Sequence, residues 1–251
     1  MKQKRVLRRY LRLKRNNFAK RYADVLVDKF YVDNYLPKLE SVLQENKDFL
    51  NEISGGYKET IEISSYSPIS YEMNVTPVIA KLLETSTLKL NHSLPIVEKK
   101  EEPLVFREYK WGDDLVKSEL FSVLEPRNDK KQVYPQVLIV PLMGFMEDCH
   151  RIGYGGGFYD RTIEQIREIY DGKMLMIGVA FEAQKFDRFT GKLAEADIWQ
   201  ENQDTKIAKM RAKHANNSAI SWVQLDTDEP LDYIITEKNI YKKEAMQGMN
   251  I

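Results

Sequence analysis

Four glycines lie between an arginine and an aspartate in one short stretch, Arg151-Ile-Gly-Tyr-Gly-Gly-Gly-Phe-Tyr-Asp160. A glycine-rich turn lets backbone N–H groups converge on an anion, and an arginine can pair bidentately with phosphate oxygens. A carboxylate at the end of the loop can hold a magnesium ion bound to the same phosphates. The stretch predicts a polyphosphate site with a divalent cation, although Asp160 could instead cap the helix that follows.

The loop differs from two familiar phosphate-binding loops. No Gly-Lys-Ser/Thr sequence closes it, which excludes a Walker A site. Counting G-x-G-x-x-G from Gly153 puts Phe158 at the third glycine position, and counting from Gly155 fails as well, which excludes the dinucleotide fingerprint. Glycines alone would also fit a plain tight connection, so the flanking Arg151 and Asp160 carry the prediction.

A buried strand precedes the loop and an amphipathic helix follows it. The strand is the apolar run 136–141, and the helix 161–170 places isoleucines on one face. Strands alternating with helices along the rest of the chain predict an α/β fold. We expect a single three-layer α/β/α domain over residues 1–251, with a mostly parallel central sheet and an amino-terminal helix. Further strands are expected at 60–66, 88–96, 173–181 and 231–236, and helices at 76–83 and near 113–121.

Ligands of such sheets bind beyond the carboxyl ends of the strands. Glu72, the glycine loop and Gln184 all follow predicted strands, so we expect them at one edge. Asp228 precedes its strand and reaches that edge only if the polar stretch 185–226, a predicted surface insertion, folds back. Glu72 could instead cap the helix near 76, and Asp228 could be a plain turn residue.

The chain opens with a strongly basic segment. Residues 2–21 hold ten lysines and arginines and no acid, and Lys4, Arg8 and Arg12 recur at helical spacing, which predicts one shared face. Such a face could be merely solvated, bind nucleic acid, belong to a transit peptide, or bring cations to a phosphate elsewhere in the fold. Residues 2–50 are expected to be mostly helical, with a break at Pro37.

The composition limits which partners, cysteine-based sites and cellular compartment the chain can have. Lysine plus arginine and aspartate plus glutamate number 38 each, so bulk charge indicates neither a nucleic-acid nor a membrane partner. The single cysteine, Cys149, excludes an internal disulfide framework and a cysteine zinc site, and favours a reducing, cytoplasmic compartment. No apolar run approaches the roughly 20 residues of a membrane span. We expect a monomer.

Several motifs together resemble those of the 5-formyltetrahydrofolate cyclo-ligase family. The glycine loop after Val140-Pro141 and Phe145 is similar to the family signature, and Lys4-Arg-Val-Leu-Arg8 is similar to its amino-terminal basic motif. The resemblance covers nearly the whole chain, apart from expansions between Arg8 and Glu72 and at 185–226. The other matching motifs are Tyr66, Pro68 and Glu72; Leu94-Pro95; Phe106; Glu125-Pro126; Gln184; and Asp228 to Glu237.

The family closes 5-formyltetrahydrofolate to 5,10-methenyltetrahydrofolate with ATP and Mg²⁺, and it releases ADP and phosphate after phosphorylating the formyl oxygen. The resemblance therefore implies ATP as co-substrate, Mg²⁺ as metal and a folate as substrate. Asp160 and Asp228 would ligate the metal, and Arg151 and Tyr159 would be catalytic. The ATP-binding residues implied in this way are Lys4, Arg8, Arg151, Gly153, Tyr154, Gly155, Gly156, Gly157, Phe158 and Tyr159.

The folate would be anchored by Glu72, because a carboxylate can pair with the adjacent ring N–H and amino donors of a pterin. Aromatic side chains suit the flat ring, and the resemblance offers Tyr66, Phe106, Trp111 and Tyr159 as walls of its pocket. Phe106 and Trp111 could equally be core residues.

The sequence departs from the family pattern just before the loop and within it. Met146 and Cys149 stand where the family usually has an aspartate and a glycine, so the turn must form without that glycine, and we expect Asp148 to help. Gly156 stands where some members carry lysine. More of the phosphate charge would then fall on the remaining cations Lys4, Arg8 and Arg151.

Two other functions remain open from the sequence. A related α/β sugar-phosphate isomerase or transferase could use the loop for a substrate phosphate and would not need ATP. A nucleic-acid-binding module could use the basic amino terminus, and its binding would be salt-sensitive and lost with residues 1–21.

Overall fold

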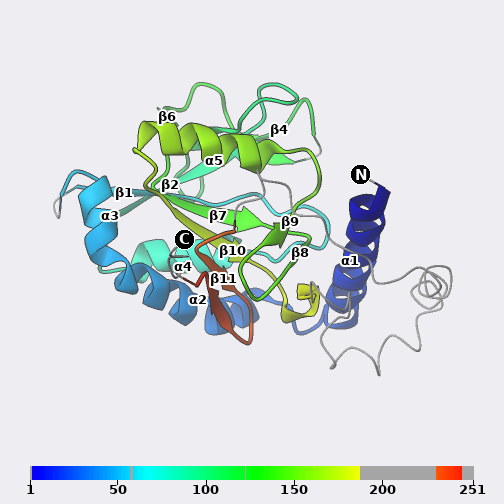
Figure 1. Ribbon diagram of the computed structural model, residues 1–251. Coiled ribbons are helices and arrows are strands. Elements are labelled where there is room, and N and C mark those ends of the chain that lie inside the picture. Colours follow the sequence, from blue (N-terminus) through cyan, green and yellow to red (C-terminus); the bar gives the residue numbers. More distant parts are fainter. Residues whose placement is uncertain (1, 57–58, 122, 187–229, 245–251) are drawn as a thin grey trace, which may run out of the picture.

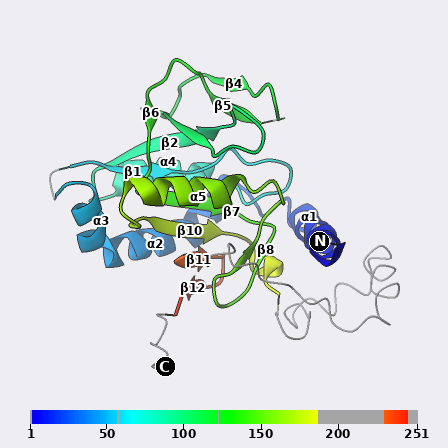
Figure 2. The same ribbon diagram turned by 45° about the horizontal axis from the view of Figure 1, so that its top comes forward.

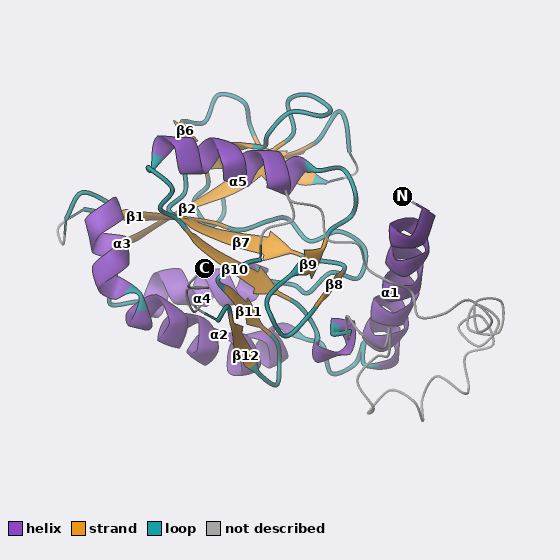
Figure 3. Ribbon diagram, viewed as in Figure 1, coloured by secondary structure: helices purple, strands orange, loops and turns teal. Residues whose placement is uncertain are grey.

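The computed structural model describes residues 2–56, 59–121, 123–186 and 230–244. Their main sheet has eight strands in the order β12-β11-β10-β7-β1-β2-β3-β6. The five strands β11, β10, β7, β1 and β2 run parallel, and the antiparallel strands lie at the two edges, as Figure 3 shows in orange. The strands are β1 (Ile61–Ser64), β2 (Leu90–Ile96), β3 (Val105–Glu108), β6 (Gln132–Val133), β7 (Val137–Pro141), β10 (Leu175–Val179), β11 (Tyr233–Ile235) and β12 (Ile240–Lys242).

Helices cover both faces of this sheet (Figure 1). Helix α5 (Phe158–Ile169) packs on one face, and α2 (Asp28–Glu45), α3 (Lys47–Ile53) and α4 (Thr76–Thr85) lie on the other. Successive residues of a strand point to opposite faces. Ile139 and Ile177 therefore join the core under α2 and α4, whereas Leu138 and Met176 join the core under α5. The predicted three-layer α/β/α architecture is confirmed.

Two local predictions were wrong. Pro37 lies inside α2 and does not break it, because burying the stripe Leu36, Leu39 and Leu43 outweighs the roughly 3 kcal/mol that an internal proline costs. The stretch 113–121 is not helical. It contains β4 (Leu115–Lys117), which pairs antiparallel with β5 (Leu124–Pro126), so tertiary pairing overrides the local pattern.

Helix α1 (Lys2–Arg21) stands beyond the carboxyl ends of the central strands, next to β8 and β9 (Figures 1 and 2). These two short strands, β8 (Gly144–Phe145) and β9 (Arg151–Ile152), pair antiparallel directly before the glycine loop. The helix is held there by one apolar cluster that joins it to this hairpin, formed by Leu7, Tyr10, Leu11, Met143, Met146, Ile152 and Phe186.

Most of the predicted insertion at 185–226 lies outside the described residues, and so does Asp228. Strand β12 follows the strand expected at 231–236 and was not itself predicted. Among the described residues, no helix has the length and apolar character needed to cross a membrane.

Candidate active site

A cavity of about 620 Å³ lies at the carboxyl ends of the central strands, between α1, the loop after β1 and the glycine loop. Its walls include Lys4 and Arg8 from α1, Tyr66 and Glu72 from the loop after β1, and every residue of 151–160. The structure thus brings together residues that lie up to 156 positions apart between Lys4 and Asp160. It supports the expectation that these groups share one edge of the sheet.

Helix α1 and the glycine loop fit closely because one loop position is a glycine. Arg8 Nε donates a hydrogen bond to the Gly153 carbonyl oxygen at 3.0 Å. Gly155 has a φ of +98°, and a Cβ there would lie 3.1 Å from Arg8 Cζ. A side chain at 155 would therefore strain the backbone and displace the guanidinium that lines the cavity.

The cationic face of α1 differs from the predicted one. Arg12 is exposed, whereas Arg15 is buried at 2% exposure. With 3.6 residues per turn, Arg15 lies about 20° from Lys4 around the helix, and Arg12 lies about 80° away. The inward-facing arginines are therefore Arg8 and Arg15, whereas Arg12, the third residue of the predicted face, is exposed.

The two ends of the glycine loop are joined by an ion pair. Arg151 Nη2 donates to Asp160 Oδ1, and the arginine side chain is 7% exposed while the aspartate side chain is 49% exposed. Gly157, with φ +66°, forms the N-cap of α5, and Asp160 lies in its first turn. The side-chain partner of Asp160 is thus Arg151, and its contribution to the helix is a favourable charge near the N-terminus.

The cavity offers carboxylates suited to Mg²⁺, which proteins at nucleotide sites usually hold with one or two carboxylates plus phosphate oxygens. Asp160 fits because it lines the cavity and is half exposed. Glu125 also lines it, and its Oε2 is buried without a hydrogen-bond partner in the described part of the chain. No cluster of three or more potential metal ligands occurs among the described residues.

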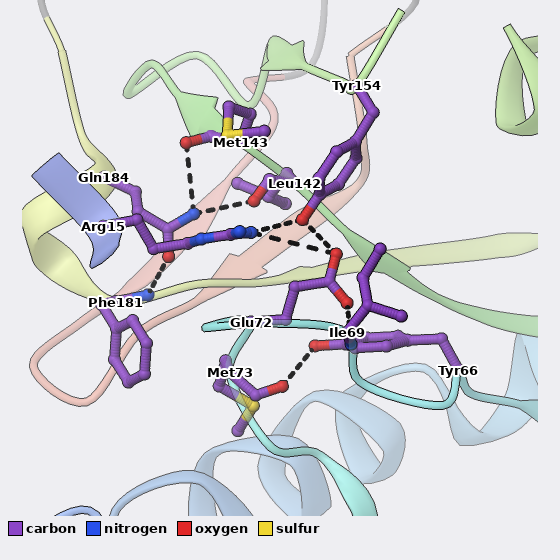
Figure 4. A network of polar contacts seen from close by, with 10 residues as sticks. All are labelled: Arg15, Tyr66, Ile69, Glu72, Met73, Leu142, Met143, Tyr154, Phe181 and Gln184. Carbon is purple, nitrogen blue, oxygen red and sulfur yellow. Dashed lines mark hydrogen bonds and ion pairs between the residues drawn. The ribbon is translucent and has the colours of Figure 1, made fainter. Parts of the chain in front are cut away.

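Glu72 lies at the centre of a polar network (Figure 4). Its Oε2 accepts from the Ile69 N–H at 2.8 Å, and its Oε1 accepts from the Tyr154 hydroxyl. Arg15 Nη1 donates to the same hydroxyl and lies 3.9 Å from Glu72 Oε1. Burial raises the pKa of Glu72, and the Tyr154 hydroxyl, the Ile69 N–H and the Arg15 charge each oppose that rise.

The carboxylate of Glu72 does not cap α4. The N–H of Thr76, where that helix begins, is bonded instead by Asn74 Oδ1 at 3.2 Å. Two tyrosines lie nearby: Tyr66 donates to the Met73 carbonyl oxygen at 2.8 Å, and Tyr159 lines the cavity from α5. Burial raises the pKa of both phenols, so both stay protonated at neutral pH.

Two predicted pocket walls lie away from the cavity. Phe106 is 2% exposed and belongs to the core under α5, which confirms the alternative that it is a core residue. Trp111 is 60% exposed. Neither lines the cavity. Aromatic wall is supplied instead by Phe121 and Phe158, whose rings meet edge to face with centroids 5.7 Å apart.

Sequence reasoning missed Arg15, Phe121 and Glu125. Arg15 stands in the basic segment and Glu125 in the Glu125-Pro126 motif, but neither position indicates that its side chain faces inward. Phe121 is brought to the cavity by the loop of the β4–β5 hairpin, which the expected helix at 113–121 concealed.

Gln184 does not line the cavity, but its hydrogen bonds connect chain segments at the edge of the site. It is 1% exposed, its Nε2 donates to the Leu142 carbonyl oxygen at 2.7 Å, and its Oε1 accepts from the Phe181 N–H at 2.9 Å. Figure 4 shows these bonds next to Arg15.

The turn before Arg151 forms with Cys149 in the left-handed region, at φ +64°. Asp148 assists as expected, since its Oδ1 accepts from the His150 N–H at 3.3 Å. The residue that replaces the family's usual glycine therefore takes up the backbone conformation that glycine favours.

Comparison with known proteins gives one family. The model of the 5-formyltetrahydrofolate cyclo-ligase family matches residues 1–189. The 5-formyltetrahydrofolate cyclo-ligase of Escherichia coli K12 is 36% identical over 89 residues, which are 34% of this chain and 47% of that protein. That of Haemophilus influenzae is 31% identical over 88 residues, covering 34% and 45%. The chain thus aligns with about half the length of these curated relatives.

Solved structures show the same fold. The NMR structure of the Aquifex aeolicus 5,10-methenyltetrahydrofolate synthetase matches with a TM-score of 0.62 and 21% identity, over 99% of this chain and 96% of that one. The synthetase from Mycoplasma pneumoniae matches with a TM-score of 0.56 and 18% identity, over 93% and 98%. With three quarters of its length matched by the family model, this chain belongs to the 5-formyltetrahydrofolate cyclo-ligase family.

Proposed function

We propose that the protein uses ATP and Mg²⁺ to convert 5-formyltetrahydrofolate to 5,10-methenyltetrahydrofolate, with release of ADP and phosphate. The observation that carries this proposal is one cavity lined by two chemically different sets of groups, which we call its nucleotide end and its folate end. One end gathers Arg8, Arg151 and the glycine loop, and the other holds the buried carboxylate of Glu72. A polyanion and a hydrogen-bond-donating ring can therefore meet in one enclosed space.

The nucleotide end neutralises phosphate charge. Lys4, Arg8 and Arg151 supply cations, and Gly153, where a Cβ would meet nothing within 4 Å, leaves the loop open to close approach by phosphate oxygens. Phosphoryl transfer depends mostly on positioning and charge neutralisation, so a rigid loop held at both ends suits it. Asp160 would hold Mg²⁺, which would supply positive charge to offset that of the phosphates.

The folate end recognises ring donors. Each carboxylate oxygen of Glu72 accepts one bond from the described residues, which leaves acceptor capacity for the pterin N–H and amino groups. Tyr66 and Tyr159 line the cavity close enough to Glu72 to feel its charge, and they offer aromatic surface for the flat ring. The formyl oxygen of the bound folate would then face the phosphates held by the loop.

The reaction needs an activated oxygen leaving group. The formyl oxygen attacks the γ-phosphorus and ADP departs; nitrogen 10 then attacks the formyl carbon and phosphate leaves. Arg151, whose side chain is buried, would stabilise charge on the transferring group. Tyr159 would contribute a neutral phenol that donates a hydrogen bond, because its raised pKa keeps the proton in place.

The proposal is tested by following the methenyl chromophore when purified protein receives 5-formyltetrahydrofolate, ATP and magnesium. We expect product with the complete mixture and none when ATP or magnesium is omitted. Product formed equally fast without ATP would contradict an ATP-dependent ligase and favour a sugar-phosphate type of chemistry. Folded protein that makes no product would refute the proposal.

Three further features belong to this proposal. Asp228 is assigned as a second metal ligand by its motif alone. The monomeric state and the cytoplasmic compartment also stay predictions, the first to be checked by light scattering and the second by cell fractionation.

A further inference from the structure

A buried guanidinium lies behind the folate end of the cavity without lining it. Arg15, on α1, is 2% exposed, and its Cζ lies over the Tyr154 ring at 5.6 Å from the centroid. A buried cation is costly unless it is paired. The charged partner that the structure places beside it is Glu72, at 3.9 Å.

The three side chains form a directional relay. A guanidinium only donates hydrogen bonds and an ionised carboxylate only accepts them. The Tyr154 hydroxyl therefore accepts a hydrogen bond from Arg15 and donates its single proton in a hydrogen bond to Glu72 Oε1. Figure 4 shows the hydroxyl between the two charged groups. The relay holds the rotamer of the carboxylate and favours its ionised form against the effect of burial.

Tyr154 belongs to the glycine loop, so the same hydroxyl also ties the loop to the other end of the cavity. Its neighbours Gly153 and Gly155 are the residues that contact Arg8. Arg15, which does not line the cavity, is thus connected to the Glu72 carboxylate through Tyr154 of the glycine loop.

We propose that Arg15 is a positioning residue for folate binding, which acts through the Tyr154 hydroxyl to hold Glu72 in place as an anion. This inference rests on the proposed function, because it assigns Glu72 to the folate. It predicts that loss of Arg15 weakens folate binding and makes that binding dependent on pH, while ATP binding changes little.

The direct test measures the Kd for 5-formyltetrahydrofolate without ATP, by calorimetry from pH 6 to pH 8. In Arg15→Met and Tyr154→Phe we expect the Kd at pH 7 to rise about tenfold, as loss of a charge-assisted hydrogen bond implies. We also expect binding to weaken further as the pH falls, because each variant removes one of the influences that lower the pKa of Glu72. Wild-type binding should vary less across the same range.

Controls separate positioning from general damage. Arg12→Met removes an exposed arginine from the same helix and should leave the Kd unchanged. Arg15→Lys keeps the charge and should restore part of the affinity and flatten the pH profile. In turnover assays of Arg15→Met, the KM for folate should rise while the KM for ATP stays within about twofold of wild type, because only Glu72 loses support.

If Arg15→Met folds too poorly to measure, Tyr154→Phe carries the test alone, because it removes only the hydroxyl. Wild-type affinity with an unchanged pH profile in Tyr154→Phe would overturn the inference and leave the proposed function intact. Wild-type protein that neither binds nor converts the folate would overturn both.

Discussion

At the residue scale, the ion pair of Arg151 and Asp160 is the feature most open to two interpretations. We predict that Arg151→Ala and Asp160→Asn each lower kcat about 100-fold or more, because both act on phosphate charge in the transition state. The melting temperature should fall by only a few degrees, since a pair with one half-exposed member contributes roughly 0–1 kcal/mol.

Steady-state kinetics and thermal unfolding of the same preparations check this prediction. Glu164→Gln, one turn further along α5 and exposed, is the matched control and should keep both values. Activity that falls only in proportion to melting temperature would assign the pair a structural role at the start of the helix.

Cys149 offers a second residue-scale test because it is fully buried at positive φ. Glycine would relieve the left-handed strain and lose a small apolar contact, so Cys149→Gly should stay within about 1 kcal/mol of wild type. Cys149→Val should be about 2 kcal/mol less stable than Cys149→Gly, because a β-branched residue fits this conformation poorly. Urea denaturation compares them, and equal stabilities would show that backbone strain at 149 is negligible.

At the element scale, the position of α1 depends on the β8–β9 hairpin. A Cβ on Gly144 would lie 2.6 Å from Leu11 Cδ1 and 3.1 Å from the Gln184 carbonyl oxygen. We predict that Gly144→Ala pushes α1 outward and raises the KM for ATP several-fold, although no residue of the nucleotide site is changed.

Leu11→Val provides the rescue, since valine has no Cδ atom. The double variant Gly144→Ala with Leu11→Val should bind ATP more tightly than Gly144→Ala alone. If the KM for ATP of Gly144→Ala matched wild type, the close fit of α1 to the hairpin would have no role in nucleotide binding.

Elements whose signals are local could be predicted from the sequence. The apolar run, glycines and isoleucine stripe of 136–170 gave β7, the loop and α5, with boundaries a few residues off. The sequence could not predict that the Arg15 side chain faces inward, because this depends on how α1 packs against a hairpin more than 120 residues away. The β4–β5 hairpin was missed for the same reason, since strand pairing and not propensity decides it.

At the scale of the whole molecule, one buried acid couples stability to pH. Glu62 lies in the central strand β1, and burial raises its pKa from 4.5 to about 7. Between these values the native state holds a proton that the unfolded chain releases. Glu62 makes its full contribution to the free energy of unfolding below pH 4.5, and this contribution is lost as the pH rises towards 7.

Glu62→Gln removes this dependence because the amide resembles the protonated acid. We predict that the variant is about 1–3 kcal/mol more stable than wild type at pH 8, with the gap closing near pH 5. Urea denaturation at both pH values measures it. A variant less stable than wild type at pH 8 would show that the ionised carboxylate is stabilising where it lies.

The arrangement of the whole chain makes the two ends of the cavity act on one pair of substrates. The most direct measurement follows methenyl product and released phosphate together during turnover by wild-type protein with 5-formyltetrahydrofolate, ATP and magnesium. The proposed function predicts one phosphate for each methenyltetrahydrofolate formed, and phosphate release that depends on the folate. Phosphate released without methenyl product, or methenyl product formed without phosphate, would contradict it.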